Sequence, residues 1–360
     1  MQVDNGRKKI IGYLCQRFLW HGKIIHVQNL NHRISMKKTM IVLFAAALGL
    51  SACNRFEKGE GDLTYRIIRN DGKEKIKEGD YVKMNGIQVV DTKNGDSIMV
   101  NTYDNERPAF FQISKQMFVG DMTAGLKLLG EGDSAVFKLN LDSMAKYSSV
   151  PKPSNAKDNY ATFTVKIEKV LHKAQNEPDS VFEKKKRDFF EEEYKALIQK
   201  NKASEAGKIS NYIKENNLEV KTTASGLQYV IENPGNTERA ALADTVLVNY
   251  TGTFTNKKSD SKPNVFDTTN EKIAKEAGIY SPQVQYMVRP LPLVMLPKGF
   301  IEGIQLVGIG GKIKLIIPSK LAYGENGGAS INPFTPLVFD VELKGIQKAG
   351  NTTGGLLNGQ

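Results

Sequence analysis

The chain has 360 residues, of which 40% are hydrophobic and 25% are charged, a balance typical of a folded globular protein with room for two domains. Its formal net charge of +11 comes mostly from residues 1–52, because the rest of the chain holds 42 basic and 38 acidic residues, a net charge of +4 that does not support nucleic-acid binding. That remainder has one cysteine and one histidine, Cys53 and His172, which argues against a disulfide framework, a Cys/His metal site, a cofactor held by such residues and a histidine-based catalytic relay.

An apolar run, residues 40–50, follows two lysines and ends at Leu50-Ser51-Ala52-Cys53. Its eleven residues rise about 1.5 Å each and cannot span a hydrocarbon core of about 30 Å, so residues 36–52 are predicted to be a signal peptide. Small residues before a cysteine resemble the lipobox of bacterial lipoproteins, which predicts a lipid on Cys53. The alternative is a free or buried cysteine after an ordinary export signal.

This interpretation predicts a lipid-anchored, extracytoplasmic protein of the cell envelope, on the outer membrane or the periplasmic face. A lipoprotein signal begins at the start of its chain, so Met36 is the expected initiator. Residues 1–35 are then a mis-assigned extension and are left out of the fold prediction.

The composition divides the rest of the chain into five segments. A charged tether, residues 53–61, precedes a strand-like region, residues 62–172. A linker rich in Lys, Glu and Asn follows over residues 173–221, strands return over residues 222–347, and a Gly/Asn-rich tail, residues 348–360, is predicted to be disordered.

The linker has helical periodicity. Pro178-Asp179 predicts the start of a helix of about twenty residues, over 178–200, and a second short helix is predicted to end at Asn216-Asn217. The apolar stripe of the first helix comprises Phe182, Phe189, Phe190, Tyr194, Leu197 and Ile198, and that of the second comprises Ile209, Tyr212 and Ile213. The favoured interpretation is a spacer packed on a neighbouring domain. The alternative is a stripe that pairs two protomers as a homodimer or receives unfolded chains.

The two strand-rich segments look like copies of one unit. Residues 61–65 parallel residues 225–229, and seventeen residues separate Leu63 from Asp80 as they separate Leu227 from Asp244. Each segment ends in an alternating strand, at residues 163–167 and 339–343. The alternative, coincidence among short strand motifs, requires several matches to fall in the same order by chance.

Five motifs follow one another in the second copy. They are Tyr250-Thr251-Gly252, Val265-Phe266-Asp267, the segment 300–307, Ile317-Pro318 before Ala322-Tyr323-Gly324, and Leu337-Val338-Phe339-Asp340. Their order and spacing resemble the FKBP-type peptidyl-prolyl isomerases. The resemblance implies an α+β fold of two FKBP-like domains, each an antiparallel sheet wrapped around a short helix, joined by a helical linker.

The resemblance also implies a site for proline-containing peptides without a cofactor. Its pocket and catalytic residues fall on Tyr250, Asp267 (a buried carboxylate in the family), Tyr323 and Phe339. Substrate-binding positions fall on Phe266, Leu291, Leu296, Phe300 and Ile331. The alternative is that these aromatic residues are ordinary core.

Prolyl isomerisation suits a site without a nucleophile. The X-Pro bond faces a barrier of about 18–20 kcal/mol because its amide is resonance-stabilised, and no bond to carbon breaks. An apolar pocket disfavours the charge-separated form of the amide, and aromatic walls favour its twisted shape. In this interpretation Tyr323 hydrogen-bonds a substrate carbonyl, while Tyr250 and Asp267 form a polar patch at the pocket edge.

Three features depart from the family pattern. Phe300 replaces the tryptophan of the pocket floor, and Pro297 lacks the backbone N–H that the family offers to a ligand carbonyl, which predicts weaker macrolide binding. The segments 255–264 and 270–289 are longer than in the family.

The first copy lacks the pocket residues. Positions equivalent to those of the site are Gly86, Met99, Val100, Met122 and Ala145, and Phe163 alone remains of the aromatic set. Residues 62–172 are therefore predicted to be a degenerate FKBP-like domain. The whole chain is predicted to be a lipid-anchored isomerase assisting unfolded envelope proteins, with a non-catalytic peptide-binding chaperone or scaffold, or a purely structural lipoprotein, as alternatives.

Overall fold

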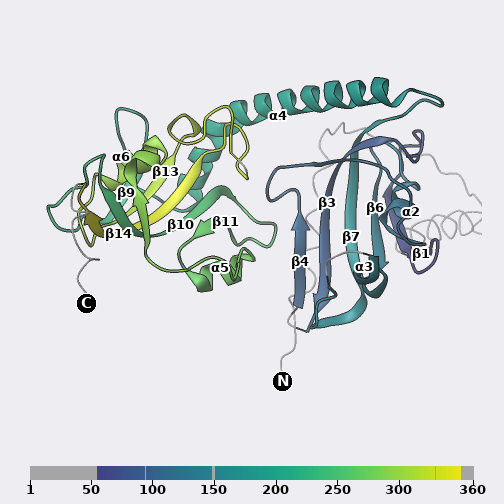
Figure 1. Ribbon diagram of the computed structural model, residues 1–360, viewed down its shortest axis with the longest axis horizontal. Coiled ribbons are helices and arrows are strands. Elements are labelled where there is room, and N and C mark those ends of the chain that lie inside the picture. The colour runs from purple at the N-terminus through teal and green to yellow at the C-terminus, as the bar shows by residue number, and fades with distance from the viewer. Residues whose placement is uncertain (1–54, 94, 148–150, 329, 350–360) are drawn as a thin grey trace, which may run out of the picture. The chain divides into compact units, whose positions relative to one another are not determined.

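The computed structural model describes residues 55–349 except 94, 148–150 and 329 (Figure 1). The expected extension, the signal peptide, Cys53 and residues 350–360 of the predicted tail lie outside the described residues. Within the described part of the chain, no helix combines the length and the apolar character needed to cross a membrane.

The described residues form an N-terminal antiparallel sheet of seven strands with the order β1-β2-β6-β7-β3-β4, and β5 pairs with β3 (Figure 1). Its buried face packs on the short helix α2 (Met122–Leu126), and α3 (Leu141–Tyr147) follows β6. The strands are β1 (Glu57–Lys58), β2 (Thr64–Arg69), β3 (Tyr81–Thr92), β4 (Gly95–Asn101), β5 (Ala109–Gln112), β6 (Ser134–Asn140) and β7 (Ala156–Leu171). The predicted tether thus contains a strand, because β1 pairs with β2.

A C-terminal sheet of seven strands, counted over the described residues, repeats this order as β8-β9-β13-β14-β10-β11, with β12 paired to β10. Its strands are β8 (Lys221–Thr222), β9 (Gln228–Asn233), β10 (Thr245–Lys257), β11 (Pro263–Thr268), β12 (Arg289–Pro292), β13 (Lys312–Ile317) and β14 (Leu337–Gln347). Its helices are α5 (Glu271–Ala277), η3 (Leu293–Met295), α6 (Lys298–Ile304) and η4 (Ser319–Leu321). Helix α6 packs on the buried face of the sheet, as α2 does in the first copy.

The strand registers match between the two sheets. Tyr250 on β10 lies opposite Val341 on β14, and Gly86 on β3 lies opposite Val165 on β7. Two residues further along each central strand, Phe339 and Phe163 occupy the same position of their sheets. The two sheets are therefore copies of one unit, aligned as the sequence predicted.

The next strand pair extends the equivalence. Asp267 on β11 lies opposite Gly252, and Val100 on β4 lies opposite Gln88. Val100 therefore takes the place of the site carboxylate in the first copy. That copy has the fold of the second copy without its polar group at this position.

The linker differs from the prediction of two helices, because α4 is one helix of 37 residues, Asp179–Glu215. The segment 201–208 contains no proline, and Gly207 costs only about 1 kcal/mol in a helix interior. Packing also holds both halves: Phe182 is fully buried, and Ile209 clusters with Ile316 and Val338 of the C-terminal sheet.

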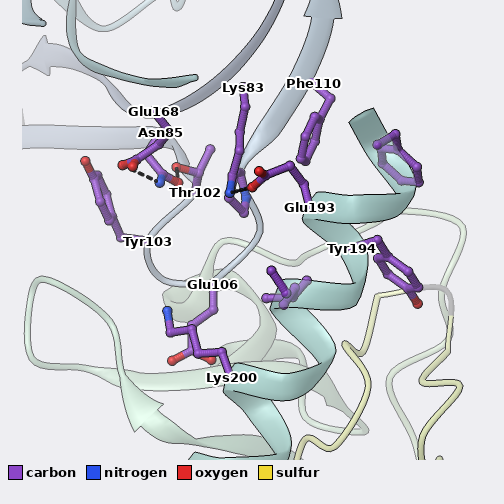
Figure 2. Close-up of a pocket in the computed structure, with 14 residues that line it drawn as sticks. Lys83, Asn85, Thr102, Tyr103, Glu106, Phe110, Glu168, Glu193, Tyr194 and Lys200 are labelled. Carbon is purple, nitrogen blue, oxygen red and sulfur yellow. Dashed lines mark hydrogen bonds and ion pairs between the residues drawn. The ribbon is translucent and has the colours of Figure 1, made fainter. Parts of the chain in front are cut away.

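The first half of α4 is fixed to the N-terminal sheet by a buried carboxylate. Glu193 is 6% exposed and pairs with Lys83 on β3 at 2.5 Å (Figure 2). It also pairs with Lys169 on β7. Burial acts to raise the pKa of Glu193, but the hydrogen bonds from Lys169 and Lys83 outweigh it, and the pKa is lowered from its usual value. Glu193 and Lys83 border a cavity of about 510 Å³ that Phe110 and Tyr194 also line.

The Glu193→Gln variant is expected to loosen α4. Breaking the ion pairs costs about 1–3 kcal/mol of local stability at pH 7, because the lysines lose their buried partner. Because the folded-state pKa is lowered, this stabilisation is present above the ordinary glutamate pKa of 4.5 and is lost as the pH falls through the folded value. Hydrogen exchange of α4 peptides at pH 7 and pH 4 measures the effect.

Glu191→Gln serves as the control, since the side chain of Glu191 is 66% exposed and its pair with Lys195 spans 4.0 Å. It should leave exchange unchanged. Equal protection in both variants at pH 7 would show that the Glu193 contacts contribute nothing.

Candidate functional site

Four aromatic rings meet on the buried face of the C-terminal sheet, and Phe339 of β14 lies at their centre. Its ring centroid is 5.3 Å from that of Phe300, 5.6 Å from that of Phe266 and 6.1 Å from that of Tyr250. The first two pairs meet at 89°, the edge-to-face geometry that aromatic pairs favour. The four residues come from α6, β11, β10 and β14, so the fold brings together side chains that are up to 89 positions apart.

Gly252 makes room for two of these rings. It lies opposite Phe339 on the neighbouring strand, and a Cβ there would meet the Phe266 ring at 2.6 Å and the Phe339 ring at 2.9 Å. In the first copy the equivalent position holds Gln88. The glycine of the Tyr-Thr-Gly motif therefore serves the packing of the aromatic cluster.

A polar group adjoins the cluster. The Tyr250 hydroxyl donates to the carboxylate of Asp267, and Arg289 Nη1 donates to Tyr250 Oη at 2.5 Å and to Asp267 Oδ2 at 3.2 Å. The Arg289 guanidinium also lies 5.3 Å from the centre of the Tyr250 ring. The predicted polar patch of Tyr250 and Asp267 is therefore completed by a cation.

Sequence reasoning missed Arg289. In the sequence, the segment 270–289 stands out only by being longer than the family pattern, and Arg289 is its last residue. Antiparallel pairing of β12 with β10 places Arg289 opposite Val248, two residues from Tyr250. The sequence alone does not show that this arginine lies beside Tyr250 and Asp267, because that proximity depends on the strand register.

The charges of the polar group balance one another. Burial, followed by the hydrogen bond to Asp267, raises the pKa of Tyr250 far above its usual range, although Arg289 partly opposes the shift. The phenol therefore stays protonated at neutral pH and serves as a hydrogen-bond group. The Asp267 side chain is 43% exposed, so the expectation of a buried carboxylate is not met: it lies at the rim, paired with a partly exposed arginine.

The structure brings seven of the nine predicted peptide-site residues into one packed cluster. These are Tyr250, Phe266, Leu291, Leu296, Phe300, Ile331 and Phe339. Asp267 joins them through Tyr250. Tyr323 lies outside the packed cluster and is 43% exposed, which leaves its hydroxyl to solvent or to a ligand.

Pro297 is the N-cap residue of α6, with φ of −57°, and its carbonyl accepts from the N–H of Phe300 at 2.9 Å. Proline suits a helix start because a first-turn N–H has no partner within the helix. The same position gives no N–H to a ligand, as the sequence predicted.

The described residues contain no group of three or more His, Cys, Asp or Glu side chains able to hold a metal ion. The arrangement is a packed apolar cluster, in which Phe300, Phe339 and Tyr250 are buried, with the partly exposed Asp267 and Arg289 at its edge. Its chemistry suits contact with an uncharged group, and the Tyr250 hydroxyl is engaged as a hydrogen-bond donor to Asp267.

Residues 236–344 match the family model of the FKBP-type peptidyl-prolyl cis-trans isomerases. The matched range lies within the C-terminal sheet and contains the four aromatic rings, Asp267 and Arg289. The fold and the match together define the C-terminal part of the chain as an FKBP-type domain.

Curated relatives carry the same family name. The chain is 37% identical over 154 residues to the FKBP-type peptidyl-prolyl cis-trans isomerase FkpA of Aeromonas hydrophila, covering 43% of this chain and 49% of that protein. It is 42% identical over 126 residues to a probable FKBP-type isomerase of Haemophilus influenzae, covering 35% and 44%. The crystal structure of FkpA from Escherichia coli is similar at 31% identity, with a TM-score of 0.37 over 48% of this chain and 75% of that one. The chain spans about half the length of the curated relatives it matches.

Gly252→Ala is expected to destabilise the C-terminal domain by about 1–3 kcal/mol, because the added methyl group must displace the rings of Phe266 and Phe339. Calorimetric melting of the full chain measures this change as a lower melting temperature. Gly207→Ala is the matched control: a Cβ at Gly207 has no heavy atom within 4 Å, and alanine favours the helix by up to about 1 kcal/mol. The two substitutions should therefore have opposite signs, and a neutral Gly252→Ala would contradict the packing role.

Proposed function

We propose that this chain is a peptidyl-prolyl cis-trans isomerase and that the aromatic cluster around Phe339 is the site that binds the proline ring. The observation that carries the proposal is the convergence of four rings from four elements beside the Tyr250–Asp267–Arg289 group, inside a domain of the FKBP type. The N-terminal sheet has the same strand register, but of the four aromatic rings it has only the equivalent of Phe339, which is Phe163.

The chemistry follows from the amide. Its barrier of about 18–20 kcal/mol reflects resonance between nitrogen and carbonyl, which is lost when the bond twists. In this proposal the proline ring packs against the apolar cluster of Phe266, Phe300 and Phe339, which excludes water and disfavours the planar, charge-separated form of the amide. Removal from water destabilises the planar amide more than the twisted amide. The apolar side chains therefore lower the barrier by binding the twisted form more tightly.

The polar groups fix the substrate. The exposed Tyr323 hydroxyl donates to a substrate carbonyl, and the Tyr250–Asp267–Arg289 group holds the edge of the site by hydrogen bonds. No proton is transferred, since the Tyr250 phenol remains protonated and Arg289 neutralises Asp267. Pro297 removes one donor that a peptide carbonyl would otherwise use, so binding relies more on apolar contact.

The proposed substrates are proline-containing segments of unfolded cell-envelope proteins. The supporting observations are the apolar run 40–50 and the Leu50-Ser51-Ala52-Cys53 motif, which favour export and a lipid on Cys53. In this proposal the lipid tethers the degenerate first copy, and the isomerase domain follows α4. The competing function is a peptide-binding module without turnover, which the missing N–H of Pro297 favours.

Asp267→Ala and Tyr323→Phe are each expected to slow catalysis of a proline-limited refolding reaction by about tenfold, because each removes one hydrogen-bonding group of the site. The rate is measured with full-length protein and an unfolded substrate. Val100→Ala is the matched control, since Val100 occupies the register position of Asp267 in the first copy.

The Val100→Ala variant should keep the wild-type rate. Wild-type rates in all three variants would contradict the proposed site. Peptide binding by the wild type without acceleration of refolding would favour the binding module instead.

Cys53→Ala is expected to abolish incorporation of a palmitate analogue in cells that express the chain and to release the protein from the membrane fraction. Cys15→Ala is the control, because Cys15 is the other cysteine and lies in the predicted extension. It should leave labelling unchanged. Equal labelling of both variants would rule out the lipid at Cys53.

A further inference from the structure

The loop between β13 and β14 carries two residues of the proposed site, Tyr323 and Ile331, and the helix α4 holds the start of this loop. The carboxylate of Glu205 on α4 accepts from the backbone N–H of Ser319 at 2.6 Å and from its hydroxyl at 2.9 Å. Ser319 is 2% exposed, so no water replaces these bonds without a rearrangement of the loop.

A second residue of α4 holds the end of the same loop. Asn201 is fully buried, and its Nδ2 donates to the carbonyl of Pro333 at 3.0 Å. One turn of helix separates Asn201 from Glu205, so both contacts come from the same face of α4. Lys202 adds a cation 5.6 Å from the ring centre of Phe334.

Backbone hydrogen bonds within the loop connect Ser319, which Glu205 holds, to the segment that carries Tyr323. The Ser319 carbonyl accepts from the N–H of Gly324 at 2.8 Å, and the carbonyl of Tyr323 accepts from Gly327 at 3.2 Å. Tyr323 lies four residues after Ser319, and Ile331 lies two residues before Pro333. With both ends fixed, the backbone that carries Tyr323 and Ile331 is restrained.

We propose that Glu205 and Asn201 are positioning residues of the isomerase site, which makes α4 part of the catalytic unit and not a passive spacer. The inference rests on the proposed function and extends it. It also gives the degenerate first copy a role, because Glu193 fixes the same continuous helix to the N-terminal sheet.

The test is a double-mutant cycle on the full-length chain with a chromogenic Leu-Pro peptide as substrate. Glu205→Ala is expected to lower kcat/KM about tenfold, because it frees the loop that carries Tyr323. Ser319→Ala removes only the hydroxyl contact and should have a smaller effect. In the Glu205→Ala background, Ser319→Ala should add nothing, since its partner is already absent.

Glu205→Gln separates positioning from a general effect on stability. Its amide oxygen still accepts from the Ser319 N–H, so most of the rate should return. Glu192→Ala, at an exposed acid of the same helix, is the control and should keep the wild-type rate. Unchanged kcat/KM in Glu205→Ala together with a lower melting temperature would overturn the proposal, as would additive effects of the two substitutions.

Hydrogen exchange of peptides covering residues 319–334 keeps the two proposals distinguishable. If the wild type shows no isomerase activity, the proposed function fails and the catalytic role of α4 fails with it. Faster exchange of the loop in Glu205→Ala would then support only the claim that Glu205 restrains the loop. Unchanged exchange would overturn that claim as well.

Discussion

The packing of Phe339 against three other rings over Gly252 is the constraint on which the C-terminal domain depends. Edge-to-face contacts at 5.3 and 5.6 Å require the neighbouring strand to carry no side chain beneath them. The same packing fixes Tyr250 at the edge of the cluster, where its hydroxyl meets Asp267 and Arg289. A single steric condition thus connects the core of the sheet with the polar edge of the proposed site.

The two sheets differ in the side chains at the positions of the proposed site and not in the arrangement of their strands. Both sheets keep one strand order and one register, yet Gly86 and Val100 stand where Tyr250 and Asp267 stand. Backbone pairing and apolar alternation maintain the fold of the first copy without any of the polar groups. The proposed function therefore depends on side chains that the fold itself does not require.

Sequence reasoning predicted the two sheets and the alignment of the copies, because strand alternation and motif order are local signals. The residues of the aromatic cluster followed from the resemblance to the FKBP family and not from the pattern alone. It divided α4 into two helices because the linker has two separate apolar stripes, and the packing of Ile209 on Ile316, which holds the end of the single helix, is not visible in the sequence. It also missed Arg289, whose role arises from pairing of β12 with a strand 41 positions earlier. The contacts of Glu205 and Asn201 were inaccessible for the same reason, because they join segments distant in sequence.

The most direct test of the central claim is a nuclear magnetic resonance titration of the isotope-labelled mature chain with a Leu-Pro peptide. If the aromatic cluster is the peptide site, chemical shifts change at Tyr250, Phe266, Asp267 and Tyr323, and exchange cross-peaks appear between the cis and trans peptide. Residues at the equivalent positions of the first copy should not shift. Shift changes at Met99 and Val100, or binding that leaves the aromatic cluster undisturbed, would contradict that claim.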